Sequence, residues 1–323
     1  MDGSDVTRRV LVTGGAGFIG SHLVDNLLAH GHSVRVLDDL STGRRNNMDA
    51  RAELVIGDIA DRSAVAAAMA DVTEVFHLAA VASVARSYDD WPGTHRINQS
   101  GTVMVLDVAR AAGLVPVVYA SSAAVYGDTG GEVAREDLAP NPMTAYGVDK
   151  LGSELHARIG SRVHGIPTLG LRFFNVYGPR QDASSPYSGV ISIFARRLVE
   201  GAPILLHGDG GQTRDFVHVS DIVAHLRAAM DRLRTDPAAS GLVLNVCTGR
   251  AVSVRELALL IGQLRGSPPH MQHVDARPDD IRYSRGGPER AAAELGMRAE
   301  IMLEEGLASV DQGGLPRLAA APP

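Results

Sequence analysis

Short apolar runs alternate with helical stretches along the first half of the chain, and this alternation limits the fold more than any other feature. The runs are rich in β-branched residues and cover residues 10–13, 33–37, 54–56, 75–78 and 115–120. Such runs are typical of parallel strands that are covered on both faces. The residues between them, 19–30, 63–69 and 102–112, have helical periodicity. Repeated strand, helix, strand units predict an α/β fold built on a doubly wound parallel sheet.

A glycine-rich turn follows the first of these strands and opens the first helix. Residues 13–20 read Thr-Gly-Gly-Ala-Gly-Phe-Ile-Gly. In a Rossmann domain such glycines allow a tight turn and let the backbone approach a pyrophosphate at the helix N-terminus. The turn therefore predicts a dinucleotide site that includes Gly14, Gly17 and Gly20.

An acidic residue selects between the two nicotinamide dinucleotides. Asp38 closes the second strand, 18 residues beyond Gly20. A carboxylate at this position can accept from the ribose hydroxyls and would repel a 2′-phosphate, which favours NAD over NADP. Arg44 and Arg45 follow closely and could accommodate such a phosphate, so the preference for NAD rests on Asp38 coming first.

Two further strand ends belong to the same edge of the predicted sheet. After the third strand, Asp58 could accept a hydrogen bond from the adenine amino group. After the fourth, the small residues beside Leu78, which are Ala79 and Ala80, would let the backbone approach the cofactor. Ordinary strand-end packing would explain both segments equally well.

The second half of the chain is organised differently. After residue 178, loops rich in Gly, Pro and Ser separate helices at 191–200, 220–232 and 254–263, and a strand pattern returns at 242–246. We expect residues 1–178 to form an NAD-binding Rossmann domain, to which segments near 215–248 return. Residues 179–323 should form mainly a smaller, interleaved substrate-binding domain, with a mobile tail from about residue 313.

Composition excludes several classes of partner. The chain has 323 residues, is 45% apolar and carries a net charge of -6, so it offers no general attraction to nucleic acid or to anionic lipid. The sequence contains neither a signal-peptide pattern nor a membrane-spanning run, and we expect a cytoplasmic protein. Its one cysteine, Cys247, should be a small core residue. We predict no metal site.

Lys150 is the only lysine, since 30 of the 31 basic residues are arginines. If arginine serves wherever a positive charge suffices, a lone lysine marks a site that needs a compact ammonium. It lies four residues after Tyr146, so on a helix the ammonium would lie near the phenol and favour its ionised form. Tyrosine and lysine also share a helix face by chance, so the surrounding motifs must decide.

A serine pair supplies the missing third group. Ser121 and Ser122 continue the strand at 115–120 towards the carboxyl edge of the sheet, where ligands bind in open α/β folds. Together with the glycine-rich turn, Tyr146 and Lys150, they complete a Ser, Tyr, Lys set. On these motifs the chain, from about residue 10 to about 295, resembles the extended short-chain dehydrogenase/reductases, and within them the UDP-glucose 4-epimerase-like nucleotide-sugar enzymes.

The resemblance implies roles for individual residues. It makes Tyr146 the catalytic base, Lys150 the group that lowers the pKa of Tyr146 and binds the nicotinamide ribose, and Ser122 a proton relay that contacts substrate. A free phenol is ionised only about one part in a thousand at pH 7, so a useful base needs a shift of about three pKa units. The family pattern also assigns further residues to the NAD site, namely Phe18, Ile19, Ile59 and Asn98. It further implies a homodimer formed through helices near 102–112 and 146–162.

Three residues in the second half match family positions that hold the sugar nucleotide. Asn175 matches a position that contacts the diphosphate or sugar, and Arg214 and Arg277 match phosphate-binding arginines. Two guanidiniums can pair bidentately with pyrophosphate oxygens. A single arginine among many is more often a solvated surface charge, so these assignments depend on the resemblance.

Two departures narrow the activity that the resemblance implies. Related dehydratases and decarboxylases carry acidic residues where this chain has Ala123 and Ala124, and elimination of a hydroxyl needs a general acid. A small residue at Ser284 looks compatible with an N-acetyl group beside the sugar.

The expected function is an NAD-dependent 4-epimerase of a UDP-hexose that acts through a transient 4-keto intermediate. The hexose would be glucose or galactose, with the N-acetylhexosamines as further candidates. The alternatives are a UDP-glucuronate 4-epimerase, another nucleotide-sugar dehydratase or reductase, and a catalytically silent NAD-sensing protein on the same fold.

Overall fold

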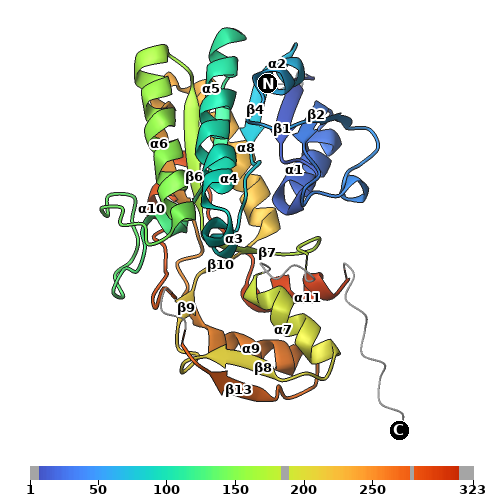
Figure 1. Cartoon of the computed structure of the whole chain (residues 1–323), viewed down its shortest axis with the longest axis vertical. Helices are drawn as coiled ribbons and strands as arrows, with labels where there is room; N and C mark the ends of the chain where they lie inside the picture. The colour runs from blue at the N-terminus through green and yellow to red at the C-terminus, as the bar shows by residue number, and fades with distance from the viewer. Residues whose placement is uncertain (1–6, 183–188, 277–279, 313–323) are drawn as a thin grey trace.

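A seven-stranded parallel sheet forms the centre of the structure, a computed structural model that describes residues 7–182, 189–276 and 280–312 (Figure 1). The strand order is β11-β6-β5-β4-β1-β2-β3, so the order reverses beside β1. This arrangement confirms the predicted doubly wound α/β fold. The strands are β1 (Arg9–Thr13), β2 (Ser33–Asp38), β3 (Glu53–Ile56), β4 (Glu74–His77), β5 (Val117–Ser122), β6 (Thr168–Phe173) and β11 (Leu242–Val246).

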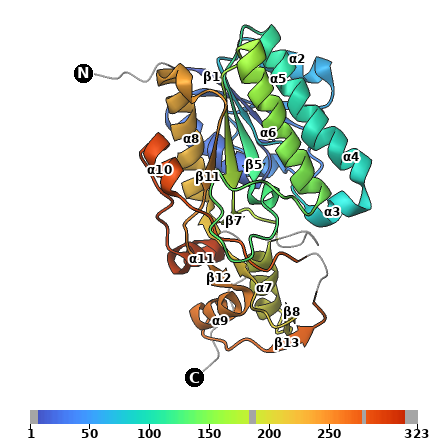
Figure 2. The ribbon, with the colours of Figure 1, turned by 90° about the vertical axis from the view of Figure 1, so that its left-hand side faces the viewer.

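Helices cover both faces of this sheet (Figure 2). One layer contains α1 (Phe18–Ala29), α8 (Val219–Thr235) and α10 (Glu289–Leu295). The other contains α2 (Arg62–Met69), α5 (Gly101–Ala111) and α6 (Ala145–His164). In that second layer, α3 (Val84–Asp89), α4 (Trp91–His95) and a π-helix at Arg96–Ser100 lead into α5.

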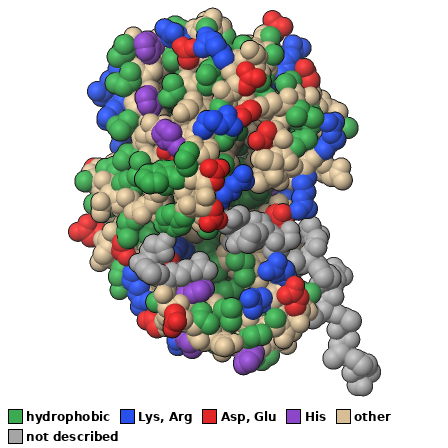
Figure 3. Space-filling view, in the orientation of Figure 1, with side chains coloured by type: hydrophobic (Ala, Val, Ile, Leu, Met, Phe, Trp, Pro, Cys, Tyr) green, Lys and Arg blue, Asp and Glu red, His purple; other side chains and the backbone are tan. Residues whose placement is uncertain are grey.

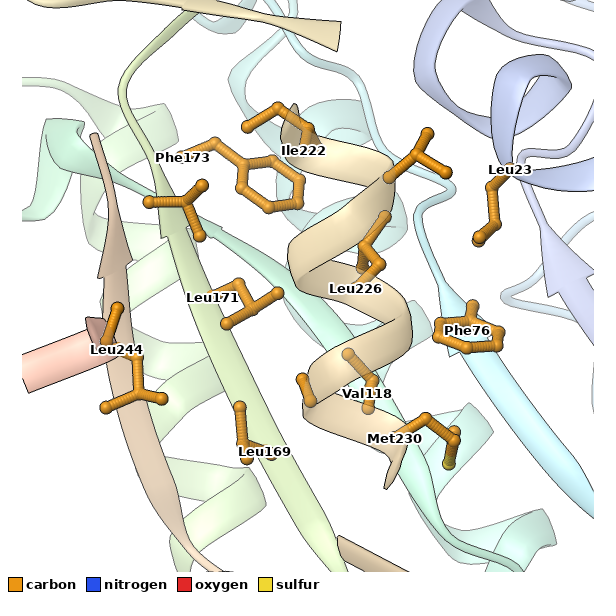
Figure 4. Close-up of a cluster of buried hydrophobic side chains, with 14 of the residues drawn as sticks. Leu23, Phe76, Val118, Leu169, Leu171, Phe173, Ile222, Leu226, Met230 and Leu244 are labelled. Atoms are coloured by element: carbon orange, nitrogen blue, oxygen red, sulfur yellow. The ribbon is translucent and has the colours of Figure 1, made fainter. Parts of the chain in front are cut away.

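The core beneath the first layer explains why α8 returns to the sheet. Ile222, Leu226 and Met230 lie four residues apart, hence on one face of α8, and all three are buried. Figure 4 shows them beside strand residues that include Phe76 and Leu171. Full burial of a side chain of this size contributes about 1.5–3 kcal/mol, so this face fixes the helix against the sheet.

A smaller group of elements lies below the sheet in Figure 1. β8 (Ile204–His207) pairs in parallel with β13 (Met271–Val274), and α7 (Val190–Val199), α9 (Val254–Leu264) and α11 (Leu303–Gln312) pack nearby. Phe194, Leu206 and Leu257 belong to its separate buried cluster. Two short pairs complete this region: β7 (Asn175–Tyr177) with β10 (Phe216–His218), and β9 (Thr213–Arg214) with β12 (Val252–Ser253).

The C-terminal tail from residue 313, which the sequence predicts to be mobile, lies outside the residues that the structure describes. Among the helices of the described segments, none is long and apolar enough to cross a membrane.

Candidate active site

A cavity of about 600 Å³ runs along the carboxyl edge of the large sheet. One end is formed by the glycine-rich turn and the ends of β2 and β3, and the other by the end of β5 and the start of α6. Most of the residues assigned from the sequence line it: Gly14, Gly17, Phe18, Ile19, Gly20, Asp38, Asp58, Ile59, Leu78, Ala79, Ala80, Ser122, Tyr146, Lys150 and Asn175.

The glycine-rich turn fits a pyrophosphate. Gly14 has a φ of +71°, and a Cβ at this position would lie 2.7 Å from the backbone nitrogen of Ala79. A Cβ on Gly20 would lie 2.1 Å from the carbonyl oxygen of Gly14. Gly17 precedes α1, and none of the described side chains caps this helix. The N–H groups of its first turn are therefore free to bind phosphate oxygens.

Asp38 is held rigidly at the end of β2. Its Oδ2 accepts a hydrogen bond from the N–H of Ala16 at 2.9 Å, and its Oδ1 accepts from the N–H of Leu40 at 2.9 Å. Burial raises the pKa of the carboxyl group, and these two hydrogen bonds oppose that effect. Each oxygen keeps a further lone pair that can accept from a ribose hydroxyl.

Of the two arginines that could have held a 2′-phosphate, Arg44 is engaged elsewhere and neither lines the cavity. Nη2 of Arg44 lies 2.7 Å from Oδ2 of Asp182, and neither Arg44 nor Arg45 is among the residues that line the cavity. The charged groups that line the cavity beside the turn are thus the carboxylates of Asp38 and Asp39. This arrangement fits NAD better than NADP.

One residue assigned to the cofactor does not line the cavity. Asn98 is 1% exposed, and both ends of its amide bind the backbone of Val81, which donates to Oδ1 at 2.8 Å and accepts from Nδ2 at 3.2 Å. Asn98 therefore fixes the loop after β4, which forms a wall of the cavity, from behind. Asp58 does line the cavity, and its Oδ2 accepts from Nη2 of Arg96 at 2.6 Å.

Ser122, Tyr146 and Lys150 meet at the other end. The hydroxyls of Ser122 and Tyr146 are hydrogen-bonded, and Oγ of Ser122 also accepts from the N–H of Ala124 at 3.1 Å. Nζ of Lys150 donates to the carbonyl oxygen of Ala120 at 2.9 Å and lies 5.8 Å from the centroid of the Tyr146 ring. The helix that carries both residues begins after Thr144, whose Oγ1 accepts from the N–H of Gly147.

Burial dominates the ionisation of both groups. It raises the pKa of Tyr146, and the hydrogen bond with Ser122 opposes this effect. The lowering expected from Lys150 is not found in the chain alone. Burial also lowers the pKa of Lys150 to about 8, against the nearby carboxylates of Asp149 and Glu154. The ammonium is therefore still mostly protonated at pH 7.

The substrate residues expected from the sequence differ in position. Asn175 lines the cavity, but Arg214 does not. Nη2 of Arg214 lies 2.5 Å from Oδ1 of Asp280, and its Nη1 donates to the carbonyl oxygen of Ile281 at 2.7 Å. Arg277 lies outside the described residues. Ser284 is half-buried and is not among the lining residues.

Several lining residues were not identified from the sequence. Among them are Val81, Phe173 and Gln181. Gln181 accepts from Oγ of Ser192 at 3.0 Å and donates to the carbonyl oxygen of Val176 at 3.2 Å, so the site fixes its amide. Their place in the sequence could have identified two of them, because Val81 directly follows Ala80 and Phe173 lies two residues before Asn175, both of which the sequence had assigned to the site.

Other kinds of chemistry find no support in the described residues. Within 7–182, 189–276 and 280–312, His, Cys, Asp and Glu side chains form no group that could hold a metal ion. Cys247 is 1% exposed, and burial raises the pKa of its thiol, which is unfavourable for a nucleophile.

Comparison with known proteins gives the same family from sequence and from structure. The sequence model of the NAD dependent epimerase/dehydratase family matches residues 10–247. The chain is 40% identical over 308 residues to the UDP-glucose 4-epimerase of Mycolicibacterium smegmatis, and the match covers 93% of this chain and 96% of that relative.

Two solved structures are similar over nearly their whole length. The UDP-glucose 4-epimerase of Thermotoga maritima, solved with UDP-glucose, has a TM-score of 0.90 at 33% identity and covers 94% of this chain and 97% of its own. The UDP-glucose 4-epimerase of Thermus thermophilus, solved in complex with NAD, has a TM-score of 0.86 at 36% identity, covering 94% and 98%. From the matched residues, the near-complete coverage and the shape of the site, the chain belongs to the NAD-dependent epimerase/dehydratase family.

Proposed function

We propose that this protein is an NAD-dependent 4-epimerase that interconverts the C4 epimers of a UDP-hexose through a 4-keto intermediate. The observation that carries this proposal is the position of Ser122, Tyr146 and Lys150 at one end of a cavity whose other end fits a dinucleotide. The relatives described above are UDP-glucose 4-epimerases, which supports UDP-glucose and UDP-galactose as the substrate pair.

The side chains at this end supply the proton chemistry. NAD, held by the glycine-rich turn and Asp38, would supply the oxidised nicotinamide that acts as hydride acceptor and donor for C4 of the sugar. Tyr146 accepts the proton of the 4-hydroxyl and later gives it back. Ser122, hydrogen-bonded to Tyr146, can relay that proton, and Lys150 adds a positive charge that stabilises the phenolate.

Elimination is the less favoured alternative because the catalytic end lacks an acid. The acidic residues among the described lining are Asp38, Asp39, Asp58 and Asp90, and they lie at the end of β2, in the loops that follow β2 and β3, or at the α3–α4 junction. The turn after Ser122 carries Ala123 and Ala124 instead. A dehydratase needs a group that protonates the leaving hydroxyl, and methyl groups cannot do this.

We assign the binding of the sugar nucleotide to Asn175, Arg214 and Arg277. Asn175 already lines the cavity. For Arg214 to bind a phosphate, its guanidinium would exchange its single contact with Oδ1 of Asp280 for the substrate oxygens, with which it could pair bidentately. We further propose that UDP-N-acetylhexosamines are accepted, because the family resemblance assigns the small Ser284 to the position beside the sugar, although Ser284 is not among the residues that line the cavity.

An exposed apolar stripe on α6 and α5 supports a proposal about the quaternary state. Val148, Leu155, Ile159 and Val163 of α6 are 45–67% exposed, and Val103 of α5 is 37% exposed. Figure 3 views the molecule from the side of these two helices, with hydrophobic side chains among the polar ones of this face. We propose that a second copy covers this stripe in a homodimer. The need for NAD and a nucleotide sugar supports a cytoplasmic location.

Incubation with single substrates tests the function. The protein is incubated with UDP-glucose, UDP-N-acetylglucosamine or UDP-glucuronate, and the C4 epimers are separated by chromatography. The proposal expects UDP-galactose from UDP-glucose, without added cofactor if NAD stays bound through purification. A product only from UDP-glucuronate would establish the first alternative. Bound NAD without turnover of any of the three would favour an NAD-sensing protein, whereas turnover only with an added reductant would indicate a net reductase.

A further inference from the structure

A buried ion pair lies directly behind the catalytic residues. Glu154 of α6 and Arg172 of β6 form two hydrogen bonds, Nε to Oε1 at 2.8 Å and Nη2 to Oε2 at 2.7 Å. Both side chains are 6% exposed. Replacing a buried ion pair by apolar residues is often neutral or stabilising, so stability alone does not account for this one.

The pair contacts the strand that carries the catalytic serine. Oγ of Ser121 donates to Oε1 of Glu154. The residues on either side of Ser121 make the catalytic contacts: the carbonyl oxygen of Ala120 accepts from Lys150, and Ser122 is hydrogen-bonded to Tyr146. Three consecutive strand residues thus meet three helix residues that are four apart on one face of α6: Tyr146, Lys150 and Glu154.

The far side of Arg172 is held by Tyr126, in the turn after β5, and through it by Asn245 of β11. Nη1 of Arg172 donates to the hydroxyl of Tyr126 at 2.8 Å, and that hydroxyl donates to Oδ1 of Asn245 at 2.7 Å. The guanidinium carbon also lies 4.7 Å from the centroid of the Tyr126 ring. Arg172 therefore has fixed partners on both sides, and it fixes the carboxylate of Glu154 in turn.

We propose that Glu154 is a positioning residue for the epimerisation, whose carboxylate, oriented by Arg172, holds the end of β5 so that Ala120 and Ser122 face Lys150 and Tyr146. This inference rests on the proposed function of the site. It adds a residue that touches neither cofactor nor substrate but determines the distance between the strand and the helix that carry the reacting groups.

The same carboxylate contributes charge at Lys150. The groups that face Lys150 are Tyr146, Asp149 and Glu154 from α6, and His77 from β4. His77 is neutral, because burial and the charge of Lys150 lower its pKa to about 3. The carboxylate of Asp149 also contacts His95, with Oδ1 of Asp149 lying 2.7 Å from Nδ1 of His95. The charge of Glu154 raises the pKa of Lys150 against the effect of burial, so without it this pKa would fall below its present value of about 8.

Two variants with matched structural damage separate positioning from packing. Glu154→Gln removes the negative charge and one of the two oxygens that accept from Arg172, and Tyr126→Phe removes another acceptor of Arg172, but only the first change lies beside the catalytic contacts. We expect Glu154→Gln to lower kcat by about tenfold or more, with KM and bound NAD close to the original values, since small displacements of reacting groups are costly. In a plot of kcat against pH for Glu154→Gln, the alkaline limb, where activity falls as the pH rises, should move to lower pH. Tyr126→Phe keeps both hydrogen bonds between Arg172 and Glu154, so it should leave the limb in place and lower kcat far less than Glu154→Gln does.

A third variant, Ser121→Ala, tests the proposal even if Glu154→Gln folds poorly. Ser121→Ala leaves the ion pair intact and removes only its contact with the strand. It should lower kcat several-fold without moving the alkaline limb, because the charge beside Lys150 is unchanged. Unaltered kcat in Ser121→Ala would overturn the positioning role, whatever happens to Glu154→Gln.

The lone lysine gives a measurement that needs no turnover. In protein labelled with ¹³C and ¹⁵N lysine, Lys150 is the one side chain that contributes a lysine signal. Its titration should move to lower pH in Glu154→Gln and stay in place in Tyr126→Phe. An equal titration in both variants, with equal losses of kcat, would reduce Glu154 to a structural residue. Absence of epimerisation in the unaltered protein would instead refute the proposed function and leave the titration test standing.

Discussion

Replacing Lys150 by methionine should stabilise the protein while it destroys the activity. Lys150 is 5% exposed, and burial lowers its pKa from 10.5 to about 8. At about 1.4 kcal/mol per pKa unit, this shift means that the folded protein holds the charged amine at a cost of about 3 kcal/mol at pH 7. Methionine has a similar length and no charge. The lost hydrogen bond to Ala120 offsets about 1 kcal/mol, so a net gain of about 2 kcal/mol is expected.

The dependence on pH identifies the source of this gain. Below pH 8 the folded and the unfolded chain both carry the proton on Lys150, and the full cost is present. Between pH 8 and 10.5 the folded chain has released the proton and the unfolded chain has kept it, so the free energy of unfolding of the unaltered protein rises with pH. The difference between Lys150→Met and the unaltered protein should therefore shrink over this range.

Urea unfolding followed by circular dichroism at pH 7 and at pH 10 measures both quantities. Lys150→Arg is the matched control, because a guanidinium stays charged at both values and should be less stable than lysine throughout. A methionine variant less stable than the unaltered protein at pH 7 would refute the reasoning. A stability difference that is the same at both pH values would refute it as well.

Three further predictions concern the cavity. Tyr146→Phe should abolish epimerisation but leave bound NAD near one per chain, as measured by absorbance after denaturation; turnover close to that of the unaltered protein would remove Tyr146 from the mechanism. Gly20→Ala should lower the melting temperature and NAD content, because its Cβ would lie 2.1 Å from a carbonyl oxygen, an overlap that costs on the order of 1–3 kcal/mol. Gly160→Ala is its control, with its nearest contact at an ordinary 3.4 Å. Asp38→Ala should weaken NAD binding by about tenfold and reduce the preference over NADP, measured by fluorescence titration; an undiminished preference would show that another group excludes the phosphate.

The sequence predicted the parts of the molecule that depend on local pattern. The strand and helix alternation gave the doubly wound sheet, and the glycine-rich turn, Asp38 and the Tyr146 and Lys150 pair all line one cavity. These features share a cause: backbone geometry at a strand end requires particular residues at fixed spacings. β5 ends at Ser122 rather than at residue 120, so the serines belong to the strand itself.

What the sequence could not supply was the partner of each charged side chain. Arg214 was expected at a phosphate, yet it pairs with Asp280, which is 66 residues away. Asn98 was assigned to the cofactor, yet its amide binds the backbone of Val81. The pKa of Tyr146 depends on how deeply α6 packs, and no spacing encodes that depth. The parallel pair of β8 and β13 also escaped prediction, because four-residue strands with partly exposed faces carry little periodicity.

The solitary lysine has a practical consequence for work on this protein. Because Lys150 is enclosed at the catalytic end of the cavity, the exterior of the fold carries no lysine amine at all. Acylating dyes, biotin esters and aldehyde cross-linkers, which react with unprotonated amines, will find no lysine on the surface, so the α-amine of the chain is their main target. Slow acylation of Lys150, located by peptide mapping and suppressed when the dinucleotide is added, would thus report occupancy of the cavity.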